Sequence, residues 1–298
     1  MQKPVIGILL YILFTITVTG MNAGAKSLQN LEMHSIEIAF IRNLLAAIGV
    51  AIIIYLKRAT ELFKTKYFKA QMIRSMLGNA SLIVAFWAVS LLPLADIVAL
   101  WFCVPLVVMV FSAIFLGEKI GIWRIFAVIT GLIAVMMISQ PAIEMQNYTG
   151  IMVGLLSTVL IASVTINLRH LAILKEHALT TTFFFLTSGT VFCGLLLPFF
   201  WTGQLLNFDF TWIILIMALC GLISQIVKTE AFRHAEASLL SPFGYLNIFW
   251  ATLLGWLLWN EIPDLYVMIG CTGLIFSNML VLWRESRQAK LKNKPVNT

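Results

Sequence analysis

Charged side chains are rare within the long apolar stretches of this sequence, so each one is a candidate for chemistry. Arg42 lies several residues into one such stretch, directly before Asn43 and five residues after Glu37. A guanidinium at this depth can hold an anionic group such as a carboxylate, or it can fix packing through an internal ion pair or a bond to a backbone carbonyl. Both interpretations of Arg42 stay open at this point.

Lys228 and Glu230 form a second candidate site near the end of another apolar stretch. Residues two positions apart do not face each other on a helix, so each needs a separate partner, a wet cavity or the membrane surface. Lys228 can extend along the helix to that surface. A buried Glu230 can exchange protons, and we therefore predict that Glu230 and Lys228 form a coupling site.

Amides and aromatic rings supply the remaining candidate contacts. Amides within apolar stretches bond polar ligand groups or join neighbouring helices, and here they are Asn79, Gln225 and Asn247. Aromatic rings in such stretches suit a flat ring or a sulfonium or quaternary ammonium cation, or else form belts at the membrane surfaces. The rings in question are Trp87, Trp101, Tyr245 and Trp250. Together with Arg42 and Asn43, these residues are the predicted substrate-binding set.

The sequence predicts no catalytic residues, no metal ligands and no cofactor. The histidines lie at separate helix ends, and the cysteines are scattered through apolar stretches without metal-ligand spacing. The phosphate-binding pattern Gly-x-x-x-x-Gly-Lys does not occur. An enzyme is therefore not expected.

Composition decides which elements must position these residues. Hydrophobic residues make up 60% of the chain and charged residues 11%, with a mean hydropathy of +0.95. A soluble domain cannot bury so much apolar surface, so a lipid bilayer must surround it. The apolar stretches predict an all-α membrane protein with ten transmembrane helices, at 4–26, 35–56, 72–91, 95–116, 121–139, 149–168, 180–200, 211–232, 238–259 and 264–283.

The net charge of +7 reflects membrane topology and not nucleic-acid binding. Lys and Arg gather in alternate connections and in the basic tail 286–298, whereas the opposite connections carry only Lys26. Cytoplasmic connections carry the excess of Lys and Arg in membrane proteins. We therefore expect a multi-pass protein of the inner (cytoplasmic) membrane with both termini in the cytoplasm.

The two halves of the chain repeat each other at a spacing of about 143 residues. Gly7 aligns with Gly150 and Glu118 with Glu261. The predicted units are a first five-helix repeat at 1–140 and a second at 146–285. Because each repeat has an odd number of helices, the second must enter the membrane in the opposite sense, which gives an inverted repeat.

Several motifs resemble those of the drug/metabolite transporter superfamily, specifically its EamA-type carriers. They are Leu116-Gly117-Glu118 and Thr130-Gly131-Leu132-Ile133 in the first half, and Ser241-Pro242-Phe243-Gly244-Tyr245, Trp250-Ala251, Glu261, Pro263 and Gly273-Leu274-Ile275 in the second. The second half departs from the pattern in having Asn260 where Gly117 stands in the first. Within the family, the stretch around Pro242 is most similar to carriers of S-adenosylmethionine, riboflavin and related metabolites.

The resemblance implies a secondary active transporter of small organic metabolites that works by alternating access, with a zwitterionic or aromatic solute such as S-adenosylmethionine preferred. An exporter of amino acids or drugs is the alternative within the family. A membrane-embedded lipid-modifying enzyme, a channel and a membrane scaffold are the alternatives from other classes. The expected partners are the solute and the bilayer, and a homodimer is left open.

Overall fold

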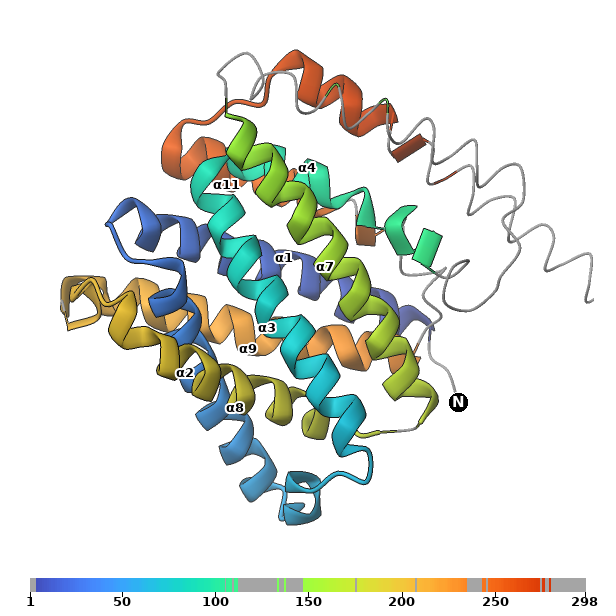
Figure 1. Ribbon diagram of the computed structural model, residues 1–298. Helices are drawn as coiled ribbons and strands as arrows, with labels where there is room; N and C mark the ends of the chain where they lie inside the picture. The colour runs from blue at the N-terminus through green and yellow to red at the C-terminus, as the bar shows by residue number, and fades with distance from the viewer. Residues whose placement is uncertain are drawn as a thin grey trace, which may run out of the picture.

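The computed structural model describes residues 4–104, 106–108, 110–111, 133, 137, 147–174, 176–206, 208–234, 243–244, 246–273, 275–276 and 279. This described part is helical and contains no strand (Figure 1). Six of its helices are long and apolar enough to cross a membrane. The predicted all-helical membrane protein is confirmed, and the count of ten helices stays a prediction.

The long helices fall close to the predicted stretches. They are α1 (Pro4–Asn30), α2 (Ser35–Leu56), α3 (Phe68–Leu91), α7 (Tyr148–Ile173), α8 (Ala178–Leu196) and α9 (Thr211–His234). Two shorter helices, α4 (Leu94–Trp101) and α11 (Leu246–Trp259), lie within the predicted spans 95–116 and 238–259 or next to them. Short 3-10 turns occupy Thr60–Phe63, Leu197–Phe199, Gln204–Leu206 and Phe208–Phe210. The predicted span 121–139 lies almost entirely outside the described residues.

Two histidines begin equivalent helices in the two halves. The backbone N–H of Ile36 donates to Nδ1 of His34 at 3.2 Å, which caps α2. The N–H of Leu179 donates to Nδ1 of His177 at 3.1 Å, which caps α8. Such a bond satisfies one of the amide groups that a helix start leaves without a partner. His34 and His177 are 143 residues apart, so the repeat extends to the capping of its helices.

Packing of the helices is symmetric between the halves. Helix α1 packs against α9 as α3 packs against α7, and α2 packs against α8 (Figure 1). Helices α1, α2 and α3 of the first half correspond to α7, α8 and α9 of the second. If each helix is exchanged for its counterpart, the contact of α1 with α9 becomes the contact of α7 with α3, and the contact of α2 with α8 stays the same. The contacts of α1 with α11 and of α7 with α4 are related in the same way. A two-fold relation between two repeats produces this pattern.

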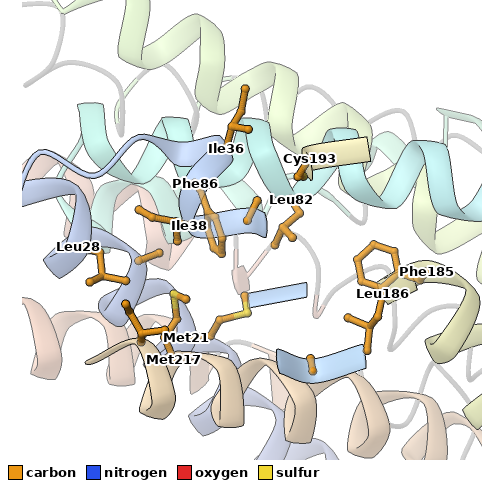
Figure 2. Close-up of a cluster of buried hydrophobic side chains, with 14 of the residues drawn as sticks. Met21, Leu28, Ile36, Ile38, Leu82, Phe86, Phe185, Leu186, Cys193 and Met217 are labelled. Atoms are coloured by element: carbon orange, nitrogen blue, oxygen red, sulfur yellow. The ribbon is translucent and has the colours of Figure 1, made fainter. Parts of the chain in front are cut away.

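The apolar core lies between helices of both halves. Met21 and Leu28 of α1, Phe86 of α3, Leu186 of α8 and Met217 of α9 are buried in one cluster (Figure 2). On the outside of the bundle, large apolar side chains stay exposed, as lipid-facing helices require. Close contact of α1 with α9 depends on Gly24, because a Cβ there would lie 2.9 Å from Cβ of Met217.

Candidate functional site

Arg42 lies fully buried at the centre of a polar cluster. Its Nη1 donates to Oδ1 of the neighbouring Asn43 at 2.8 Å, and its Nη2 donates to the carbonyl of Gly221 on α9 at 3.2 Å. Both Arg42 and Asn43 are 0% exposed. A Cβ at Gly221 would lie 2.7 Å from Nε of Arg42, so glycine makes this approach of α2 to α9 possible.

Asn43 and Asn79 extend the cluster to two further helices. Nδ2 of Asn43 donates to Oδ1 of Asn79 at 3.1 Å. Nδ2 of Asn79 in turn donates to the carbonyl of Ser75 at 2.8 Å and to that of Phe185 on α8 at 3.1 Å. A Cβ at Gly189 of α8 would collide with both amides. The cluster therefore joins α2 and α3 of the first half to α8 and α9 of the second, and it brings three predicted site residues together.

Arg74 is a member of this region that the sequence did not single out. Its position near a basic connection made it resemble the cytoplasmic topology charges, but it lies within α3 and is only 4% exposed. Its Cζ is 4.5 Å from the centre of the Phe185 ring, and Cζ of Arg42 is 5.7 Å from the same centre. A Cβ at Gly78, one turn later, would collide with Nη1 of Arg74. Arg74 and Gly78 are four residues apart and so share one face of the helix. This spacing is the feature of the sequence that could have indicated Arg74.

Lys228 and Glu230, the predicted coupling pair, have separate surroundings. Nζ of Lys228 lies 5.1 Å from the centre of the Phe14 ring on α1. Glu230 pairs with His234, one turn later on the same helix, with Oε1 and Nε2 3.3 Å apart. Side chains of this second pair are each about a third exposed, at 34% and 30%. An exposed pair within one helix contributes little to stability, and the coupling role of Glu230 stays a prediction.

Aromatic candidates do not converge on the arginines. Trp87 is 45% exposed, and its predicted role in substrate binding stays a prediction. Nε1 of Trp101 donates to Oγ of Ser157 at 2.7 Å and joins α4 to α7. Trp250 packs against Phe249 with ring centres 4.8 Å apart. Tyr245 lies outside the described residues.

Two amide candidates lie away from the Arg42–Asn79 bonds. Oδ1 of Asn247 accepts from Oγ1 of Thr19 at 3.4 Å, between α11 and α1. Gln225 is partly buried on α9, one turn after Gly221. The contact of Asn247 is one of interhelical bonding, and the predicted roles of Asn247 and Gln225 in substrate binding stay predictions.

Lys26 and Glu261 tie the two halves together at one end of the bundle. Their Nζ and Oε1 atoms are 2.5 Å apart. Nζ of Lys26 also donates to the carbonyl of Leu92 at 3.3 Å, and Oε2 of Glu261 accepts from the N–H of Leu94 at 3.2 Å. In the topology predicted from the sequence, Lys26 is the only Lys or Arg in the connections on the outer side of the membrane. The pair closes this end between α1 and the chain that follows α11.

Glu37 does not contact Arg42. Its carboxylate accepts from the N–H of Leu205 at 3.2 Å, from the N–H of Thr202 at 3.3 Å and from the hydroxyl of Thr202. These bonds hold the 3-10 turn at Gln204–Leu206 against the start of α2. Among the residues that the structure describes, no group of three or more His, Cys, Asp or Glu side chains could hold a metal ion.

Helices of this length and polarity, closed around a buried polar cluster, define a multi-pass membrane protein built from two related halves. Residues 5–140 and 148–283 each match the model of the EamA-like transporter family. The chain therefore belongs to the EamA-like transporter family, which confirms the resemblance seen in the sequence.

Similar proteins are named as transporters of several metabolites. The chain is 30% identical over 270 residues to a pseudopaline exporter of Pseudomonas aeruginosa strain UCBPP-PA14, with 89% of this chain and 91% of that protein covered. It is 26% identical over 250 residues to a riboflavin transporter of Vibrio cholerae, with 82% of each covered. It is 22% identical over 266 residues to an S-adenosylmethionine uptake transporter of Rickettsia bellii, with 88% of each covered.

A solved crystal structure has the same fold. It matches with a TM-score of 0.66 at 15% sequence identity, over 95% of this chain and 98% of that one. The fold is thus shared with that protein across nearly the whole length of the chain.

Proposed function

We propose that this protein is a secondary transporter of small organic metabolites in the cytoplasmic membrane, and that its two inverted halves alternate access around the Arg42 cluster. The observation that carries the proposal is the network of Arg42, Asn43 and Asn79, which joins helices of both halves at nearly full burial. Carriers with inverted repeats bind their solutes between the repeats near the bilayer midplane.

Burial of the cluster supports alternation as the route of access. A solute can reach Arg42 only if helices of the two halves separate, since Arg42 and Asn43 are 0% exposed. The Lys26–Glu261 pair is positioned to hold one end closed while the other opens. A proton gradient, a solute gradient or exchange supplies the energy, and Glu230 is the proposed coupling residue.

The recognised group is a carboxylate. Arg42 has a buried Nε that no described residue accepts from, so a carboxylate can add a charged hydrogen bond there. S-adenosylmethionine, the solute preferred from the sequence, offers such a carboxylate. Its sulfonium would need the predicted aromatic site, and exposure of Trp87 weakens that part of the match. Export is favoured over uptake by the higher identity to the exporter, 30% against 22%.

Counterflow in liposomes tests the proposal. Purified protein is reconstituted, unlabelled solute is trapped inside, and uptake of labelled S-adenosylmethionine, riboflavin and amino acids is followed. A carrier gives saturable uptake that accelerates when the same solute is trapped on the far side. Uptake that is linear in concentration and indifferent to trapped solute would indicate a channel and contradict the proposal.

A further inference from the structure

Two buried arginines and one partly buried lysine lie near one another between the halves. Arg42 of α2 and Arg74 of α3 both lie against the ring of Phe185, at 5.7 and 4.5 Å. Lys228 of α9 follows Gly221, the acceptor for Arg42, by seven residues. Seven residues are about two helical turns, so Lys228 lies on the same face of α9, about 10 Å further along. Arg74 precedes Asn79, the α3 member of the Arg42 cluster, by five residues, which is about one and a half helical turns.

None of these cations has an acidic partner among the described residues. The nearest carboxylates along the same helices are already bonded elsewhere: Glu37 to Thr202 and Leu205, and Glu230 to His234. Within the described part of the chain, Nε of Arg42 and both Nε and Nη1 of Arg74 are buried without an acceptor. The ring of Phe185 lies close to both guanidinium groups, but it supplies no oxygen or nitrogen acceptor for those N–H groups.

Such an arrangement is costly without an anion. Buried like charges repel strongly at low dielectric, and a buried N–H without an acceptor loses its full hydration. One carboxylate can be bound bidentately by one guanidinium, and it would leave the other two cations uncompensated. A solute with several anionic groups would neutralise the region and use the unpaired N–H groups.

We propose that the transported solute carries at least two anionic groups, one bound by Arg42 and a second bound by Arg74 together with Lys228. This inference rests on the proposed function and narrows its substrate class to di- and tricarboxylates or chemically equivalent anions, which excludes S-adenosylmethionine with its single carboxylate. Arg74 and Lys228 then select for the second anion, and Arg42 binds the first.

Binding to a graded set of probes tests the selection. Alanine, glutamate and N-(carboxymethyl)glutamate carry one, two and three carboxylates, and their affinities are measured by titration calorimetry on protein in nanodiscs at fixed ionic strength. Glutamate is expected to bind about ten- to a hundredfold tighter than alanine, the gain from one added charged hydrogen bond. The tricarboxylate is expected to bind at least as tightly as glutamate.

Substitutions then assign the gain to the two cations. Arg74→Gln and Lys228→Gln should each remove about tenfold or more of the preference for glutamate and leave alanine binding within about twofold. Arg58→Gln and Lys57→Gln, at exposed positions after α2, are the matched controls and should leave the preference unchanged. Thermal stability separates binding from packing: Arg74→Gln should keep or raise the unfolding temperature of the solute-free protein, because it removes an unpaired buried charge.

Each contrary outcome is distinct. Equal affinity for alanine and glutamate, or binding of none of the probes by a protein that carries S-adenosylmethionine or riboflavin, would overturn the inference and leave the proposed function. A lowered unfolding temperature of Arg74→Gln with equal loss for every probe would make Arg74 a packing residue and also overturn it. Failure of counterflow for every solute would instead overturn the proposed function.

Discussion

Breaking the tie between Lys26 and Glu261 should open the end of the bundle that it closes. In the structure the two charged atoms are 2.5 Å apart, and the side chains are only 8% and 25% exposed. Each side chain also bonds backbone at the start of α4 or just before it, through Leu92 and Leu94. Glu261→Gln keeps the shape of the side chain and removes its charge.

The size of the effect follows from this geometry. A largely buried charged hydrogen bond is worth about 1.5–3 kcal/mol. If the closed state alone contains the bond, its loss raises the ratio of open to closed molecules about ten- to a hundredfold, since about 1.4 kcal/mol corresponds to a factor of ten. The amide oxygen introduced by Glu261→Gln would still accept from the N–H of Leu94, so the fold should be retained.

A single cysteine reports the opening. Ser224 is 1% exposed on α9, one turn after the acceptor of Arg42, and Ser224→Cys is made in a background whose four native cysteines are replaced by Ala. The rate of labelling by a charged maleimide then follows the population of open molecules. Glu261→Gln should raise this rate about ten- to a hundredfold. The exposed Glu61→Gln should leave the rate unchanged.

The double variant provides the decisive comparison. If the pair acts as one closure, Lys26→Gln combined with Glu261→Gln should label no faster than the faster of the two single variants. Additive rates, or an unchanged rate in Glu261→Gln at an unchanged unfolding temperature, would refute the reasoning that this pair closes the bundle.

Three further perturbations act on other contacts. Gly189→Ala places a Cβ against the amides of the cluster and should abolish counterflow. Gly255→Ala is the control and should retain counterflow, because its Cβ would meet only ordinary contacts at 3.6 Å or more. Equal activity of the two variants would contradict the placement of the site. Glu37→Gln weakens the charged hydrogen bonds to the turn at Thr202 and should lower the unfolding temperature by about 3–6 °C. An unchanged unfolding temperature would contradict this role of Glu37. Burial lowers the pKa of His34, while Glu37 acts against this shift, so the neutral capping form is favoured at neutral pH. The stabilisation by this cap is then lost as the pH falls below about 6.5, the ordinary pKa of histidine. His34→Asn, a cap that does not titrate, should remove about 2 °C of the acid-induced fall in unfolding temperature. An identical pH profile of the variant and the wild type would exclude the cap as the source of that fall.

Helices could be predicted because lipid imposes a simple rule on the sequence. An apolar stretch long enough to span the bilayer must be helical, and polar breaks such as the one before His34 separate the stretches. The start of α2 at Ser35 was therefore predicted to the residue. The start of α3 was predicted at residue 72 and lies at Phe68, because charges near a helix end look like loop charges in a sequence.

Cluster residues could be predicted in part. Arg42, Asn43 and Asn79 were identified because polar groups deep in apolar stretches need partners. Which helices supply those partners depends on how the two halves pack against each other. The sequence of a single apolar stretch does not determine this packing. Arg74 was missed for this reason, since hydropathy does not tell whether a cation near a helix end points to water or to Phe185. A ring that faces lipid and a ring that faces a site look alike in sequence, so the exposed Trp87 stays a prediction.

Counterflow by Arg42→Ala tests the central claim most directly. The variant is compared with the wild type and with Arg58→Ala in liposomes, using the solute that the wild type carries, after confirming that all three proteins fold and insert equally. The buried position of Arg42, between Asn43 and the carbonyl of Gly221, predicts that the variant loses accelerated exchange while Arg58→Ala retains it. Exchange by Arg42→Ala at the wild-type rate would show that the buried cluster only holds the helices together and that the solute binds elsewhere.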